Sequence, residues 1–186
     1  MHIRPLDFDR DMMALSAFLE EAEQRRLQQV RGAIEDGDSI VLVAEANGRV
    51  VGWAAAQTRY REDLGWEPDS DALHFVSGEN AYLENLEVAE FFRGQGIGRE
   101  LLAAAEEQIR RRGRQVMWLH VAEQNYRAHR FYEREGWSHA RTVYPAWRNG
   151  APTRIYVKSL PLSVSSTTAV PFALPPFAAA STRVVL

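Results

Sequence analysis

The sequence predicts an α/β (α+β) fold, in which helices flank a sheet that mixes antiparallel and parallel strands. Residues 39–46 and 49–60 are apolar, β-branched runs separated by Asn47-Gly48, a dipeptide typical of two-residue hairpin turns, so they are expected to pair antiparallel. Residues 82–122 then read as strand, helix and strand, and that order favours parallel pairing.

The composition indicates one domain of ordinary size and excludes several kinds of chemistry. The chain has 186 residues, no cysteine and a net charge of −3, so disulfides, thiolate metal sites and a cysteine nucleophile are excluded, and no basic field attracts nucleic acid. The histidines lack metal-ligand spacing, so no metal site is expected. The first residues lack the apolar core of a signal peptide, which predicts a cytoplasmic enzyme that does not enter the membrane.

The N-terminal part is expected to form a short strand followed by helix. Residues 2–4 can pair as a strand that Pro5 breaks, and Asp7 or Asp9 can cap the helix that follows. Apolar residues then recur at intervals of three and four as far as Gly37. This spacing fits either one long helix or two short ones.

The segment 61–80 interrupts the strand pattern and is rich in acidic and aromatic side chains. It carries six carboxylates against a single arginine, with Trp66, His74 and Phe75 interleaved. Two interpretations stay open at this point, a solvated connector and an acidic, aromatic wall that faces a cationic substrate.

Residues 93–99 form a glycine-rich turn between a strand and a helix. Gly94, Gly96 and Gly98 have no Cβ, so backbone N–H groups of this turn can converge on an anion at the positive end of the following helix. No Lys-Ser or Lys-Thr follows the last glycine and the spacing is not G-x-G-x-x-G, so neither a P-loop nor a dinucleotide fingerprint is present. The turn predicts a phosphate site, with a ligand-free glycine turn as the alternative.

The remainder of the core is expected to supply two helices and three strands. Ile97, Leu101, Ala105 and Ile109 step by four along the face that the first of these helices buries, and Asn125 can cap the second. The expected bounds are Ile97 to Gly113 for the first helix, 115–122 for a strand, 125–136 for the second helix, and 137–144 and 153–160 for two closing strands around Asn149-Gly150.

Two segments resemble signatures of one superfamily. Arg93-x-x-Gly96-x-Gly98 resembles the pyrophosphate loop of the Gcn5-related N-acetyltransferase (GNAT) superfamily, which reads Gln or Arg, two residues, Gly, one residue, then Gly or Ala. Further along, Asn125-Tyr126-Arg127-Ala128-His129-Arg130-Phe131-Tyr132, followed after three residues by Gly136-Trp137, resembles the N-x-x-A-x-x-F-Y-x-x-x-G-F/W segment of the same superfamily. The resemblance covers residues 1–160, and the two segments together are more specific than either alone.

The resemblance implies a central mixed, mostly antiparallel sheet of about seven strands with flanking helices. It also implies acetyl-CoA (coenzyme A) as cofactor, bound where two neighbouring strands splay apart, with His120 on a strand that points toward the site. The implied cofactor-binding residues are Leu86, Glu87, Val88, Arg93, Gly94, Gln95, Gly96, Ile97, Gly98 and Arg99 on the strand and the turn, and Asn125, Ala128 and Tyr132 on the later helix.

Glu84 and Tyr132 are the candidate catalytic residues. Histone acetyltransferases of the superfamily carry a glutamate at a position that aligns with Tyr82, so Glu84, two residues later, is the candidate base. The string Tyr82-Leu83-Glu84-x-x-x-Val88 resembles that of aminoglycoside 6′-N-acetyltransferases, and Glu84 can act through a water or hold the substrate ammonium. Tyr132 is the candidate acid, because a phenol can give its proton to a leaving thiolate within reach. A partly exposed strand carboxylate and a core tyrosine are the structural alternatives.

Together, the residues and the resemblance predict an acetyl-CoA-dependent N-acetyltransferase that acts on a primary amine of a small cationic molecule. Two alternatives stay open, an acetyltransferase for protein or peptide amines and a regulatory module that binds acetyl-CoA without turnover. Residues 1–160 are expected to form the N-acetyltransferase domain, and 161–186 a Pro-, Ala- and Ser-rich tail. The tail is apolar, so it is expected to dock on its own domain or to exchange between the protomers of a homodimer, with free disorder as the alternative.

Overall fold

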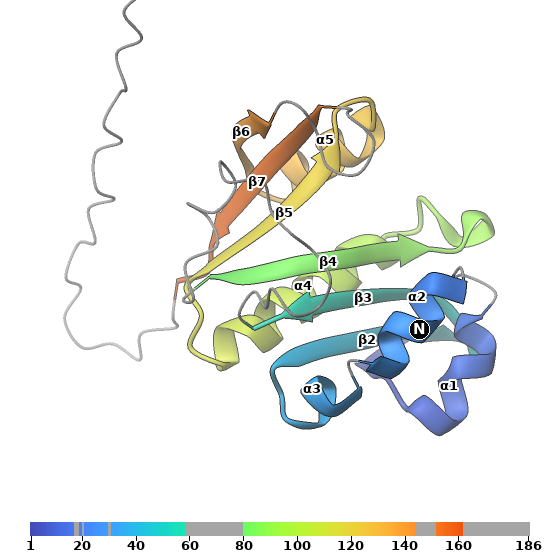
Figure 1. Cartoon of the computed structure of the whole chain (residues 1–186). Coiled ribbons are helices and arrows are strands. Elements are labelled where there is room, and N and C mark those ends of the chain that lie inside the picture. The colour runs from blue at the N-terminus through green and yellow to red at the C-terminus, as the bar shows by residue number, and fades with distance from the viewer. Residues whose placement is uncertain (17–18, 20, 30, 59–79, 144–151, 162–186) are drawn as a thin grey trace, which may run out of the picture.

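The computed structural model describes residues 1–16, 19, 21–29, 31–58, 80–143 and 152–161. Their strands form one seven-stranded, mostly antiparallel sheet in the order β1-β2-β3-β4-β5-β7-β6 (Figure 1). The strands are β1 (His2–Pro5), β2 (Ser39–Ala46), β3 (Arg49–Gln57), β4 (Ala81–Val88), β5 (Val116–Ala122), β6 (Ser138–Val143) and β7 (Thr153–Ser159). The predicted mixed α/β fold is confirmed.

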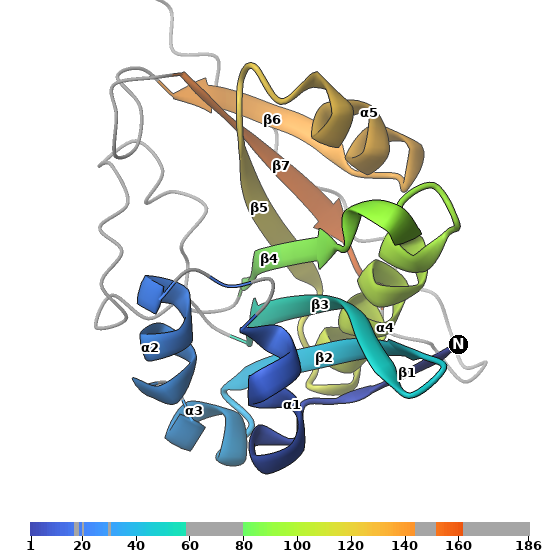
Figure 2. The same ribbon diagram turned by 90° about the vertical axis from the view of Figure 1, so that its right-hand side faces the viewer.

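Helices cover both faces of this sheet. The N-terminal region forms three helices, whereas the sequence predicted either one long helix or two short ones. They are α1 (Phe8–Leu15), α2 (Glu21–Gln29) and α3 (Arg31–Glu35). These lie on one face, and α4 (Ile97–Arg111) lies on the other, while α5 (Tyr126–Arg134) sits beside β6 (Figure 2). Within the described part of the chain, every helix is too short or too polar for a membrane span.

Local sequence explains most element boundaries. The Asn47-Gly48 turn has positive φ at both residues, 51° and 74°, and it closes the predicted hairpin with Ala46 opposite Arg49. Asp7 caps α1 by accepting from the N–H groups of Asp9 and Arg10, as the sequence suggested. Pro5 is the last residue of β1 and pairs with Leu42 of the neighbouring β2, whereas the sequence predicted a strand that ends at Arg4.

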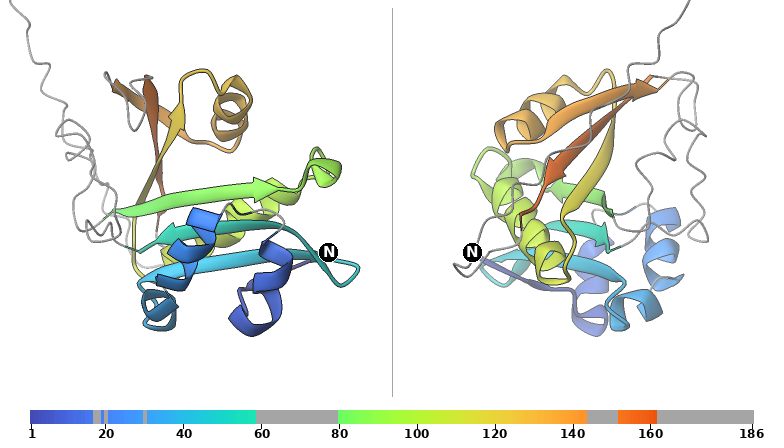
Figure 3. Two further views of the ribbon diagram at one scale, coloured as in Figure 1. Left: turned by 45° about the vertical axis from the view of Figure 1, so that its right-hand side comes forward. Right: turned by 90° about the vertical axis from the view of Figure 1, so that its left-hand side faces the viewer.

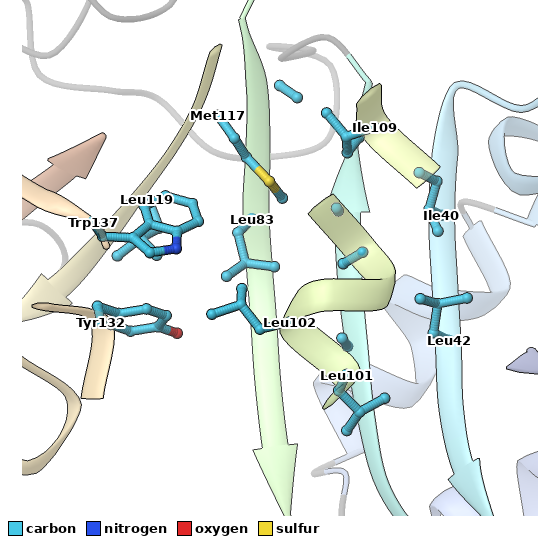
Figure 4. Packing of buried hydrophobic residues seen from close by; sticks show 14 of the residues in the cluster. Ile40, Leu42, Leu83, Leu101, Leu102, Ile109, Met117, Leu119, Tyr132 and Trp137 are labelled. Atoms are coloured by element: carbon cyan, nitrogen blue, oxygen red, sulfur yellow. The ribbon is translucent and has the colours of Figure 1, made fainter. Parts of the chain in front are cut away.

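Two apolar layers hold the sheet between its helices. The larger layer packs α4 against the sheet, and it buries the predicted stripe Ile97, Leu101, Ala105 and Ile109. Figure 4 shows Leu101 and Ile109 of this stripe facing the sheet. The smaller layer lies on the face of α1–α3 and is built around Trp53 of β3. Because both faces of β2 and β3 are covered, these strands read as nearly continuous apolar runs rather than alternating ones.

The sheet opens between β4 and β5. These two parallel strands pair only through Ala81 with Met117 and Tyr82 with Trp118, and then they diverge (Figure 3). Beyond that point β5 stays paired with β7 along its whole length, from Val116 to Ala122. The splayed strands implied by the resemblance are therefore present, and they leave the outer part of β4 without a ladder partner on β5.

Several expectations fall outside the described residues. These are most of the acidic segment 61–80, the Asn149-Gly150 turn between β6 and β7, and the tail beyond Pro161, including its expected docking or exchange. The division into a domain of residues 1–160 and a tail of residues 161–186 therefore stays a prediction.

Candidate active site

The glycine turn adopts a conformation that favours glycine. Gly94 and Gly96 have φ values of +80° and +86°, and a Cβ placed on either would meet nothing within 4 Å. Gly96 is the N-cap of α4, so the free N–H groups of the first helical turn follow it directly. The side chain of Arg93 folds back, and its Nε donates to the carbonyl of Val88 at 2.8 Å. The turn thus has the left-handed backbone and open surface of an anion cradle at a helix N-terminus.

This turn forms one wall of a cavity of about 590 Å³ between the diverging halves of the sheet. Every residue that the resemblance implied for the cofactor lines it, except Gln95, whose amide donates instead to the carbonyl of Phe91. Five lining residues were missed by the sequence reasoning, namely Phe92, Arg127, Phe131, Arg134 and Glu135. Four of these lie on or next to α5, where a spacing of three and four residues could have revealed a shared face.

Asn125 and Tyr132 place α5 along the cavity. The side chain of Asn125 accepts from the N–H of Ala128 at 3.1 Å and caps the helix as expected. Tyr132 lies on the inner face, 9 % exposed, and packs edge-on against Trp137. Burial raises the pKa of its phenol well above the ordinary value, so the group keeps its proton at any physiological pH.

A β-bulge places Glu84. Asn85 pairs with Ala55 and Leu83 pairs with Ala56, so Glu84 is the extra residue between two adjacent positions of β3. The bulge reverses the alternation of β4, and Leu83 and Leu86 consequently both pack toward the layer under α4. A regular strand would place these two side chains on opposite faces.

The same bulge brings two carboxylates of β4 to the opposite face. Glu84 accepts a hydrogen bond from Nε2 of Gln57 at 3.3 Å, and Glu87 accepts a long one from the indole N–H of Trp53 at 3.5 Å. Trp53 belongs to the layer under α1–α3. Glu84 is half-buried and lies outside the lining of the cavity, whereas Glu87 contributes to that lining.

Tyr82 and His120 join the two diverging strands at the base of the opening. The phenol oxygen of Tyr82 lies 2.8 Å from Nδ1 of His120, and the two rings are stacked. Tyr82 also packs against Trp118 at a centroid distance of 4.4 Å. Tyr82 stands where histone acetyltransferases of the superfamily carry glutamate, and it opens the string that resembles aminoglycoside 6′-N-acetyltransferases. Its contacts with His120 and Trp118 supply a structural reason for an aromatic residue there.

The residues at the cavity fit a phosphate-bearing cofactor such as coenzyme A. The glycine turn offers backbone N–H donors at residues that have no Cβ, and an arginine lies at each end of the turn. The outer edge of β4 offers backbone groups that are not paired with β5. Among the described residues, no group of three or more His, Asp or Glu side chains is arranged to hold a metal ion.

Comparison with known proteins gives relatives of several kinds. An "Uncharacterized N-acetyltransferase" of Archaeoglobus fulgidus is 36% identical over 92 residues, which are 50% of this chain and 55% of the relative. The streptothricin acetyltransferase of Streptomyces lavendulae is 33% identical over 105 residues, 56% of this chain and 47% of that protein. The chain thus spans about half the length of the curated relatives it matches.

Solved structures share the fold over most of the chain. The ribosomal-protein-alanine N-acetyltransferase of Brucella melitensis has a TM-score of 0.67 and 26% identity, covering 86% of this chain and all of its own. An aminoglycoside 6′-N-acetyltransferase complexed with coenzyme A has a TM-score of 0.61 over 86% of this chain and 97% of its own, but only 15% identity, so it shows the fold alone. A model of the Acetyltransferase (GNAT) family, a family that uses acetyl-CoA, matches residues 8–137. The chain belongs to the GNAT family of acetyltransferases.

Proposed function

We propose that this protein transfers an acetyl group from acetyl-CoA to a primary amine of a small cationic molecule. The observation that carries the proposal is the position of the glycine turn, the outer edge of β4 and the inner face of α5 around one cavity, with the carboxylate of Glu84 on the strand that bounds it. Membership of the family indicates acetyl transfer as the reaction. The carboxylate of Glu84 is the reason for proposing a cationic acceptor.

The cavity residues divide into those that hold the cofactor and those that act on the reacting groups. Acetyl-CoA, when bound, supplies an activated acetyl group as a thioester. Backbone N–H groups from Gly94 to Arg99 would hold the pyrophosphate, and the edge of Leu86 to Val88 would offer donors to the pantetheine arm and to a carbonyl oxygen. Tyr132, buried and protonated, stands as the donor to a departing sulfur.

Glu84 is proposed to receive or hold the acceptor ammonium. The carboxylate is half-buried, and its hydrogen bond from Gln57 fixes its direction on the face of β4 that α1–α3 cover. A carboxylate so placed can take a proton through a water or pair with a cation. Glu87 lies on the same face and adds a second negative charge, which favours a cationic acceptor over a neutral or acidic one.

A protein or peptide amine is the second candidate acceptor. The 26% identity and full-length match to the ribosomal-protein-alanine N-acetyltransferase favour it. The streptothricin acetyltransferase, in contrast, is named for a small molecule.

Thiol release from acetyl-CoA, measured across aminoglycosides, polyamines, amino acids and N-terminal peptides, tests the proposal. We expect turnover with a small polyamine or aminoglycoside and little with the peptides. Glu84→Gln should lower kcat/KM for that amine by about 100-fold or more, whereas Glu67→Gln, in the acidic segment, should have a small effect. Turnover with the peptides alone would contradict a small-molecule acceptor and support a protein or peptide amine. Tight binding of acetyl-CoA without thiol release from any acceptor would instead favour a regulatory module.

A further inference from the structure

Two arginines on α5 line the cavity and lack a partner within the described part of the chain. Arg127 and Arg134 both contribute to the lining, and both side chains are exposed. Neither forms an ion pair or a hydrogen bond to another described residue. They are seven positions apart, so two helical turns place them on the same side of α5, about 10 Å apart along its axis.

The other charged groups of the cavity already have partners. Arg93 donates its Nε to the carbonyl of Val88 at 2.8 Å, and Arg99 lies 3.6 Å from a carboxylate oxygen of Glu135. The side of the cavity formed by α5 therefore carries positive charge that no other described residue neutralises. Guanidinium groups that line one cavity without a partner favour an anion with several acceptor oxygens, such as a phosphate.

We propose that Arg127 and Arg134 form a second phosphate subsite, which binds the 3′-phosphate on the ribose of coenzyme A. This inference rests on the proposed function. Coenzyme A has two separate anionic centres, the pyrophosphate and the 3′-phosphate, and the glycine turn already provides donors for one of them. The terminal phosphate carries a charge near −2 at neutral pH, so guanidinium groups at the rim of the cavity are the matching partners.

The subsite makes the protein discriminate between coenzyme A and its 3′-dephospho form. A direct contact to the terminal phosphate adds affinity only for the ligand that carries it. A general positive field at the cavity mouth would instead raise the affinity for both ligands, because both carry the pyrophosphate. The two explanations therefore predict different affinity ratios.

Calorimetric titration with coenzyme A and with dephospho-coenzyme A tests the subsite. The wild-type protein should bind coenzyme A about tenfold more tightly or better. In the double variant Arg127→Ala/Arg134→Ala the two affinities should become equal, with that for dephospho-coenzyme A unchanged. Arg130→Ala is the matched control, since Arg130 is exposed on the same helix but does not line the cavity, and it should keep the preference. Raising the salt concentration should reduce the preference.

Two results would overturn the subsite and leave the proposed function standing: equal binding of both ligands by the wild-type protein, or equal weakening of both ligands in the double variant. If the wild-type protein binds neither ligand, the proposed function fails and the subsite fails with it. Circular dichroism of each variant confirms that a loss of binding is not a loss of fold.

Discussion

Lys158 and Glu106 form an ion pair that joins the two halves of the splayed sheet. Nζ of Lys158, on β7, lies 2.7 and 2.8 Å from the two carboxylate oxygens of Glu106, on α4. The same ammonium donates to the carbonyl of Glu135, next to α5, at 2.7 Å. Since β4 and β5 share only two residue pairs, this single lysine of the chain connects helices that line opposite sides of the cavity.

Replacing this lysine should lower the stability of the fold. Lys158→Met removes the charge at similar volume and leaves the carboxylate of Glu106, 15% exposed, without its cation, so the free energy of unfolding should fall by about 3 kcal/mol. Urea denaturation measures that loss. Arg111→Met, which breaks only an exposed pair with Glu107 on α4, should cost about 0.5 kcal/mol or less. Equal losses in the two variants would show that Lys158 is not a structural link.

A side chain at Gly96 should abolish cofactor binding. The residue has φ +86° at the start of α4 and lines the cavity, so Gly96→Val both strains the turn and intrudes where phosphate must approach the backbone. We expect no measurable binding of coenzyme A by calorimetry in a protein that keeps its circular dichroism spectrum. Gly113→Val is the control, because Gly113 has φ +77° but lies outside the cavity lining. Wild-type affinity in Gly96→Val would contradict the cradle.

The hydroxyl of Tyr132 should matter for turnover and not for binding. Tyr132→Phe keeps the ring that packs on Trp137, so coenzyme A affinity should stay within about twofold, while kcat should fall about 100-fold if the phenol donates the proton. Because burial raises the pKa of Tyr132, its titration should not produce an alkaline limb in the kcat profile below about pH 10. Tyr126→Phe, exposed at the start of α5, should leave kcat unchanged. An unchanged kcat in Tyr132→Phe would show that the phenol does not donate the proton and that the residue serves only in packing.

Asp11 should stabilise the fold in a pH-dependent manner. Two hydrogen bonds from Arg4, at 2.6 and 2.7 Å, hold the pKa of the buried Asp11 carboxyl below its ordinary value. Its contribution is therefore complete above the unfolded pKa of about 3.9 and is lost as the pH falls through the lower folded value. Asp11→Asn should cost about 3 kcal/mol at pH 7, and the difference from wild type should shrink below about pH 4.

Denaturation of both proteins between pH 2.5 and 7 measures this difference at each pH. Asp9→Asn is the control, since its carboxylate is exposed on the same helix. A difference that stays constant over the whole range would mean that the Arg4 contact does not depend on the charge of Asp11.

Truncation after Leu160 should leave cofactor binding intact. Leu160 is 5% exposed, and its N–H donates to the carbonyl of Gln115 at 2.7 Å, so the described sheet holds the chain in place as far as this residue. Calorimetry should give an affinity for coenzyme A within a few-fold of the full chain. Light scattering on both proteins tests the expected homodimer: a dimer that becomes a monomer on truncation supports exchange of the tail, and an unchanged number of subunits removes that explanation.

The sequence predicted what depends on neighbouring residues. The Asn47-Gly48 hairpin, the Asn125 cap and the buried stripe of α4 follow from turn chemistry, capping and helical period, which act over a few residues. The resemblance added the sheet and gathered the cofactor residues, of which only Gln95 lies outside the cavity lining. The assignments of Glu84 and Tyr132 to catalysis stay predictions.

Only the tertiary structure decided which side chains meet across the sheet. Strand alternation places Glu84 and Glu87 on opposite faces, and the bulge against β3 puts both on the same face. The pairing of Tyr82 with His120 likewise depends on where β4 and β5 part. A bulge and a divergence are properties of paired strands whose register is set by packing on both faces, so no local pattern encodes them. The sequence by itself thus determined the hairpin, the glycine turn and the helices that follow it, and packing determined which side chains of β4 share a face.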